Sequence, residues 1–302
     1  MSASTASGRA LSNTGELENL TSTRSRRTGL LLVVPGVLGL ALGFIVPLLY
    51  MIGMSFNRGG ADGMIEDTFT LDMYTRALGD GYYWSVIWNT FKMGLVVAVF
   101  CVVLSYPIAL FLARTKSRYR GLLMAAAIAP LLTSAVVRTY GWMVILGPVG
   151  LINSAMRWFG YTGPPLELVN NMTGVQIGLI EIFMPYAILA MISGFGGLST
   201  QLEEAAGSLG ANKVEVFRRI TPPLTVPGVL TAFLLVFVLA ISTFITPRLL
   251  GGGVVQVLAT EIYDQTTGLL NWPFAAALSV ILLVMFGLII AAYQRLTRTI
   301  GA

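Results

Sequence analysis

Residues Thr200–Leu224 read T-Q-L-E-E-A-A-G-S-L-G-A-N-K-V-E-V-F-R-R-I-T-P-P-L and lie between two long apolar runs. Thr200 and Glu203 have the spacing of a capping box, so a helix is expected to begin at Gln201. Gly210 is expected to end that helix, because a glycine commonly follows the last helical turn. The pattern therefore predicts a short helix with its own start and stop inside a loop.

A second short helix is predicted in the same loop. Asn212 and Glu215 repeat the capping-box spacing, and Pro222–Pro223 are expected to stop the helix because proline disrupts its hydrogen bonding. Both helices carry apolar residues at helical spacing: Leu202, Ala205, Ala206 and Leu209 in the first, and Val214, Phe217 and Ile220 in the second. Such a face predicts a surface for another protein. The alternative is a helix pair that packs on the chain's own helices.

The composition predicts an integral membrane protein. The chain has 302 residues, of which 55% are hydrophobic and only 11% are charged, whereas soluble domains carry about 25% charged residues. Runs of about 20 apolar residues cross a bilayer as helices, and the strict alternation of a barrel strand is absent from the sequence. We expect an all-α fold of six transmembrane helices over about 29–54, 85–112, 122–146, 173–198, 226–245 and 273–293.

The basic residues predict the orientation of these helices. Thirteen of the 19 Lys and Arg lie before the first run, between the second and third, between the fourth and fifth, or after the sixth. By the positive-inside rule both termini are cytoplasmic. Residues 1–27 are then a polar cytoplasmic tail, and 28–302 form the transmembrane domain with the loop 200–224 on the same side. The basic residues are explained by orientation, so no nucleic acid is expected as a partner.

Several chemistries are excluded by residue type. The chain has no histidine and a single cysteine, Cys101, which excludes an internal disulfide, a Cys/His metal site and imidazole acid–base chemistry. The sequence lacks a G-x-x-x-x-G-K-[ST] phosphate-binding loop, so it is not expected to bind ATP. We therefore expect no catalytic residue, no metal and no cofactor in this chain.

The loop resembles a known family motif. The motif consists of E-A-A, Gly after three further residues, Ile after nine more, and a dipeptide ending in Pro after one more. In this sequence the matching residues are Glu204, Ala205, Ala206, Gly210, Ile220 and Pro223. This resembles the EAA loop of binding-protein-dependent ABC import permeases, with Pro222 where the family usually has Leu. The resemblance implies an ABC type I importer-like permease whose cytoplasmic coupling helix docks on an ATPase.

The resemblance also implies the rest of the assembly. In this family two ATP-binding subunits bind ATP and Mg, a second homologous permease completes the path, and a periplasmic protein delivers the solute. Such a chain is a multi-pass protein of the bacterial inner membrane and is not itself an enzyme. A secondary transporter driven by an ion gradient, a membrane-bound enzyme and a receptor subunit are the competing interpretations, and they leave the loop unexplained.

Further segments resemble the spermidine/putrescine permease group, and within it the PotB-type half. They are Phe69–Tyr74 (F-T-L-D-M-Y), Tyr106–Leu110 (Y-P-I-A-L), Val137–Trp142 (V-R-T-Y-G-W), Gly150–Asn153 (G-L-I-N) and Thr246–Gly253 (T-P-R-L-L-G-G-G). The resemblance implies a small cationic amine as solute. Relatives for opines, phosphonates and other small organic solutes share much of these segments, so a different solute is the alternative.

Five residues are candidates for the solute path. Glu181 lies well inside the fourth run, where a charge costs about 2.5–3.5 kcal/mol on insertion scales; it would attract a cation, or instead form an ion pair, with Lys92 as one possible partner. Tyr140 and Trp142 would gate the path or belong to the interfacial belt. Ser242 and Thr243 would bond the solute or their own backbone.

Overall fold

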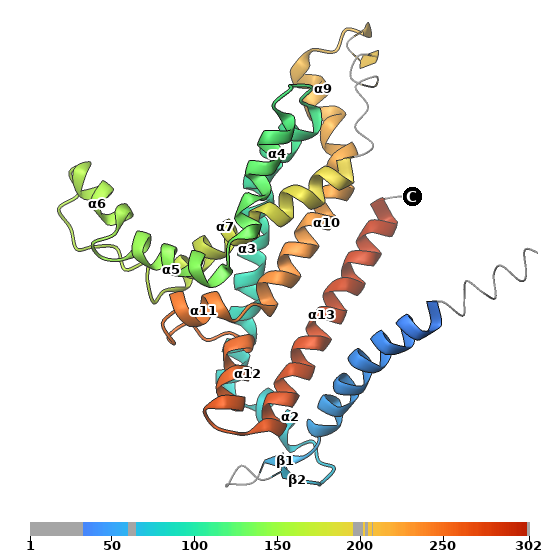
Figure 1. Cartoon of the computed structure of the whole chain (residues 1–302), viewed down its shortest axis with the longest axis vertical. Helices are drawn as coiled ribbons and strands as arrows, with labels where there is room; N and C mark the ends of the chain where they lie inside the picture. Colours follow the sequence, from blue (N-terminus) through green and yellow to red (C-terminus); the bar gives the residue numbers. More distant parts are fainter. Residues whose placement is uncertain (1–32, 60–64, 196–201, 203–204, 207, 301–302) are drawn as a thin grey trace, which may run out of the picture. The chain divides into compact units, whose positions relative to one another are not determined.

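A computed structural model describes residues 33–59, 65–195, 202, 205–206 and 208–300 (Figure 1). The chain divides into two compact units, Met1–Met54 and Ser55–Ala302. In the first unit the described part is the 22-residue helix Val33–Met54, which contains an 18-residue stretch with a mean hydropathy of 2.3. At 1.5 Å per residue it is about 33 Å long, enough to cross the hydrocarbon core. It agrees with the predicted first span from residue 33 onward.

Six helical segments of the described chain are long and apolar enough to cross a membrane. They are Val33–Met54, Gly81–Arg114, Ala135–Trp158, Met172–Gly194, Thr221–Ser242 and Trp272–Arg295. The predicted number of spans and the helical class are confirmed. The fifth helix begins five residues earlier than predicted, and residues 196–198 of the predicted fourth span lie outside the described residues.

Three helices form the centre of the second unit: α3 (Gly81–Arg114), α7 (Met172–Gly194) and α10 (Thr221–Ser242). They run side by side in Figure 1 and share one buried apolar cluster. Small side chains let helices approach closely in membranes, and the cluster includes Ala98, Cys101, Ala187, Ala232 and Ala240 beside Val97, Leu179, Val236 and Phe237. This core fixes the two helices that flank the loop 200–224.

The predicted third span over 122–146 is wrong as one continuous helix. The structure has α4 (Arg120–Ile128), a 3-10 turn η1 (Ala129–Leu132), then α5 (Ala135–Leu146) and α6 (Leu151–Trp158). Pro130 in η1 has no amide hydrogen to continue the α-helical pattern. Thr133 and Ser134 have extended backbones, with ψ of 136° and 134°. Because of this break, the third candidate span comprises residues 135–158, which include α5 and α6.

The remaining elements lie before α3 and after α10. The short strands β1 (Arg58–Gly59) and β2 (Ile65–Glu66) pair antiparallel, and α2 (Asp72–Gly79) follows. After α10 come α11 (Ile245–Leu250), α12 (Leu258–Thr267) and α13 (Trp272–Ile300). A second apolar cluster, which includes Met73, Tyr83, Leu258 and Phe274, joins α2, α3, α12 and α13.

Candidate functional site

The first helix of the loop ends as its sequence predicts. Gly210 has a φ of +90°, a left-handed conformation that glycine adopts without steric cost. The amide of Leu209 donates to the Ala205 carbonyl at 3.2 Å, and that of Ala211 donates to the Ala206 carbonyl at 3.0 Å. This six-to-one bond is typical of a Schellman ending. The predicted start at Thr200–Glu203, and Glu204 of the family motif, lie outside the described residues.

The second helix of the loop is α9 (Lys213–Arg219), and its predicted capping box is present. The Asn212 side chain accepts from the amides of Val214 at 3.0 Å and Glu215 at 2.9 Å. The Glu215 carboxylate accepts from the Asn212 amide at 3.1 Å. These bonds satisfy amides that the first turn of a helix leaves without partners.

The role expected of the two prolines differs from the observed one. Ile220 is already the C-cap of α9, and Pro222 and Pro223 stand in the first turn of α10. Proline is favoured there because first-turn amides have no partner within the helix. The prolines therefore begin the next transmembrane helix, one residue after the loop helix has ended.

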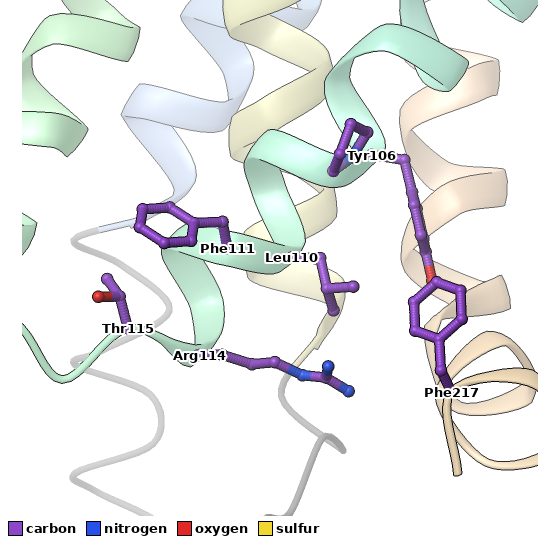
Figure 2. Close-up of a pocket in the computed structure, with 7 residues that line it drawn as sticks. Tyr106, Leu110, Phe111, Arg114, Thr115 and Phe217 are labelled. Atoms are coloured by element: carbon purple, nitrogen blue, oxygen red, sulfur yellow. The ribbon is translucent and has the colours of Figure 1, made fainter. Parts of the chain in front are cut away.

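The apolar face predicted for the loop is uncovered in this chain. Leu209 is 90% exposed, Val214 67%, Leu202 48% and Phe217 45%. A hollow of about 360 Å³ lies where the two loop helices meet, lined by Leu209, Gly210, Ala211, Glu215, Val216, Arg219 and Ile220. Exposed apolar surface of this kind marks an interaction site. Leu209 and Val214 are therefore mostly exposed, whereas Phe217 lines a cavity together with Tyr106 and Leu110 of α3 (Figure 2).

Polar contacts tie the end of α3 to the start of α10. Arg114 Nη2 donates to the Thr221 hydroxyl at 2.8 Å, and the hydroxyls of Tyr106 and Thr225 lie 3.0 Å apart. The Thr225 hydroxyl also donates to the Thr221 and Pro222 carbonyls, each at 3.0 Å. These contacts fix the first turn of α10 against α3, directly after the loop.

The helices on either side of the loop touch at two glycines. A Cβ added to Gly194, at the end of α7, would lie 2.2 Å from Gly228 Cα on α10. Only glycine permits so close an approach of two backbones. Movement of the loop would therefore act on a direct contact between α7 and α10.

Within the membrane helices, Glu181 is held by two donors. Arg138 Nη1 lies 3.3 Å from Glu181 Oε1, and Trp142 Nε1 donates to Oε2 at 3.2 Å. The Arg138 side chain is 12% exposed and that of Glu181 is 35% exposed. The partner of the carboxylate is thus Arg138 on α5, whereas Lys92 is exposed on α3. The structure brings together two predicted path residues, Glu181 and Trp142.

The other predicted path residues are placed differently. Tyr140 on α5 is 53% exposed. Ser242 donates to the Leu239 carbonyl of its own helix at 3.1 Å, and Thr243 is the C-cap of α10. Ser242 thus shows the backbone bonding expected as the alternative to solute binding.

A family model described as "Binding-protein-dependent transport system inner membrane component" matches residues 105–300. The chain belongs to this family. As a member it is a permease subunit of an ABC importer and a multi-pass protein of the bacterial inner membrane.

Full-length relatives and one fold relative agree with this membership. The permease is 35% identical over 262 residues to the spermidine/putrescine transport system permease protein PotB of Escherichia coli (strain K12), covering 87% of this chain and 95% of that one. It is 32% identical over 257 residues to the protein of the same name from Haemophilus influenzae (strain ATCC 51907 / DSM 11121 / KW20 / Rd), covering 85% and 90%. A crystal structure of a bacterial ABC transporter that imports the acidic polysaccharide alginate has the same fold, with a TM-score of 0.73, 16% identity, and coverage of 94% and 100%.

Sequence reasoning missed two polar groups of the permease. In the sequence, Arg114 counts only among the basic residues that predict the orientation, and Arg138 has no predicted partner. Both are committed to specific partners, Thr221 and Glu181. A signal for the Arg138 contact is the lone acid of an apolar run, Glu181, which requires a cation nearby.

Proposed function

We propose that this permease forms, with a second permease, the path for a polyamine or similar small cationic amine that a periplasmic protein delivers. The observation that carries the proposal is the 35% identity, over 87% of the chain, to a relative named for spermidine and putrescine transport. The match covers 262 residues and so extends well beyond the loop common to importers. An opine, a phosphonate or an amino-acid derivative is the alternative solute.

The loop that includes Gly210 and α9 is proposed to couple the permease to two ATP-binding subunits. Its support is the exposure of Leu202, Leu209, Val214 and Phe217, together with the positive-inside rule, which predicts the loop and both termini on the cytoplasmic side of the membrane. Residues Glu204, Ala205, Ala206, Gly210, Ile220 and Pro223 would transmit the movement. ATP and Mg would be bound, and ATP hydrolysed, by those partner subunits.

The Glu181 carboxylate is proposed to contact the solute by exchanging partners. Its ion pair with Arg138 neutralises both charges while no solute is present. An incoming ammonium group would compete with the Arg138 guanidinium for the same oxygen, and the Trp142 ring beside it offers a face to a cation. A Glu181→Gln variant is expected to weaken cation uptake, and unchanged affinity and rate would reject the role.

The test of the solute uses the complete transporter. The periplasmic protein of the same system is screened for ligands by thermal shift, and ATP-driven uptake of radiolabelled spermidine is measured in proteoliposomes. A shift and uptake with spermidine or putrescine support the proposal. A shift with another solute, and none with polyamines, would reject the polyamine assignment while leaving the permease role intact.

A further inference from the structure

A polar cluster joins α12 to the first turn of α3. Its members are Glu261 and Gln265 of α12 and Tyr82 of α3. Glu261 is 6% exposed and Gln265 is 2% exposed, whereas Tyr82 is 45% exposed. The Tyr82 hydroxyl donates to Glu261 Oε2, and Gln265 Nε2 donates to Glu261 Oε1, each at 2.9 Å. The carboxylate is thus removed from water and held by two donors that carry no charge.

One acceptor of this cluster has no partner. Gln265 Oε1 is buried and accepts no hydrogen bond from any described residue. It lies close to the carboxylate, because the oxygen and nitrogen of one amide are about 2.2 Å apart and the nitrogen contacts Glu261. Turning the amide over would place its oxygen against the carboxylate, so the bond to Glu261 determines which atom is unpartnered. Buried acceptors in native proteins rarely lack both a donor and a cation.

The charge of Glu261 is also uncompensated, because it forms no ion pair within the part of the chain that the structure describes. Two arginines of neighbouring elements have other partners. Arg248 pairs with Asp264 at 2.9 Å, and the Arg76 guanidinium lies 4.8 Å from the centre of an aromatic ring of α13. Asp80, the N-cap of α3, is a further acid beside the cluster. A buried charge is stable when it is paired or bound to a cation.

We propose that Glu261 and Gln265 bind one alkali-metal cation, Na⁺ or K⁺, whose ligands include the Glu261 carboxylate and Gln265 Oε1. Carboxylate and carbonyl oxygens are the ligands that such hard cations take in proteins. The ion supplies both the charge that the carboxylate lacks and the partner that the amide oxygen lacks. Protonation of the carboxylate would remove the charge but would leave one end of the Gln265 amide without a partner.

The ligand set favours a monovalent ion over a divalent one. Ca²⁺ sites commonly use several carboxylates, and the described residues contain no group of three or more His, Cys, Asp or Glu that could hold a metal. The Asp264 carboxylate is engaged by Arg248. The lack of histidine excludes a Cys/His site but has no bearing on an ion bound by oxygen alone. The ion would fix α12 to α3, and its binding is independent of which solute is carried.

The test measures thermal unfolding of the complete purified transporter in the chlorides of sodium, potassium, choline and N-methylglucamine at equal ionic strength. The parent is expected to unfold at a higher temperature in sodium or potassium chloride than in either organic salt. Glu261→Gln keeps the shape of the side chain and removes its charge. This variant is expected to lose the difference between alkali and organic salts.

Two controls separate this site from other cation effects. Asp264→Asn removes an acid from the same helix and is expected to keep the gain in alkali salts. Spermidine added in choline chloride is expected to give no gain that depends on Glu261. The proposal is overturned by equal unfolding temperatures of the parent in all the salts, by an alkali gain that survives in Glu261→Gln, or by an equal loss in Asp264→Asn. A Glu261-dependent gain from spermidine alone would also overturn it, because an organic ammonium group would then occupy the site.

A binding measurement covers the case in which Glu261→Gln does not assemble. Gln265→Met removes the amide oxygen, keeps the Glu261 charge and has a similar size. The affinity of the purified transporter for radiolabelled sodium or rubidium is expected to fall about ten-fold in this variant, since a contact between a neutral ligand and a charge is lost. Asp264→Asn is expected to bind as the parent does. Parent affinity in Gln265→Met, or an equal loss in Asp264→Asn, would refute the site.

Discussion

The contact between Gly194 and Gly228 makes a quantitative prediction about the helices that flank the coupling loop. In Gly194→Ala the new Cβ would lie 2.2 Å from Gly228 Cα, where ordinary contact begins at 3.4 Å, a shortfall of 1.2 Å. The obstructing atom is backbone and cannot rotate away, so α7 and α10 must separate. Overpacking of this kind costs about 1–3 kcal/mol, and we expect the upper half of that range.

The reciprocal variant and a control sharpen this prediction. A Cβ on Gly228 would meet Gly194 Cα at 3.0 Å, a milder conflict, whereas Gly287 in α13 has nothing within 4 Å of its added Cβ. Thermal unfolding of the purified transporter should rank Gly194→Ala as least stable, then Gly228→Ala. Gly287→Ala should be neutral, or stabilised by up to about 1 kcal/mol from helix propensity. If Gly194→Ala unfolds at the same temperature as Gly287→Ala, the close helix crossing is refuted.

Three other variants test the local contacts. Glu181→Gln leaves the Arg138 charge without its carboxylate and should lower the free energy of unfolding by about 3 kcal/mol, the low end for broken buried pairs because Glu181 is partly exposed. The double variant Glu181→Gln/Arg138→Gln should recover part of that loss. If the two single losses simply add in the double variant, the two side chains are not coupled. Asn212→Ala should destabilise α9 by about 1 kcal/mol and speed amide hydrogen exchange in that helix. Asn212→Asp should keep the capping bond and the slow exchange. Equal exchange rates in the two variants would contradict the cap. Gly210→Ala places a side chain on a residue with a φ of +90° and should destabilise the loop by about 1–2 kcal/mol. The same exchange experiment measures this effect. Exchange rates equal to those of the wild type would rule out the strain.

The end of the first loop helix and the cap of the second were predicted correctly because their signals are local. Asn212, Glu215 and Gly210 act through backbone groups within a few residues, so their spacing determines the caps without reference to the rest of the chain. The number of spans was predictable for a related reason, since each depends on one apolar run of sufficient length. These features need no knowledge of which helices are neighbours.

The errors arise where hydropathy was averaged over a whole run and where distant residues decide. The run 122–146 is mainly apolar, and its mean hydropathy alone does not show that Pro130, Thr133 and Ser134 divide it. The partner of Glu181 depends on how α5 packs against α7, so sequence distance gave no reason to prefer Arg138 to Lys92.

Two outer acids show the same limitation. Glu261 and Asp264 lie in a polar segment after α11, yet Glu261 is only 6% exposed. It accepts hydrogen bonds from Tyr82 and Gln265, each at 2.9 Å. Asp264 pairs with Arg248 at 2.9 Å. Tyr82 is far from Glu261 in sequence, so only the folded chain brings them together.

Reconstitution tests the central claim most directly. The permease is placed in proteoliposomes with and without its second permease and the two ATP-binding subunits, and solute accumulation is measured with the periplasmic protein and ATP present. Accumulation should require every subunit and ATP, and should stop when the apolar loop face is disrupted by Leu209→Asp. Accumulation by the permease alone, driven by an ion gradient and indifferent to ATP, would contradict the account.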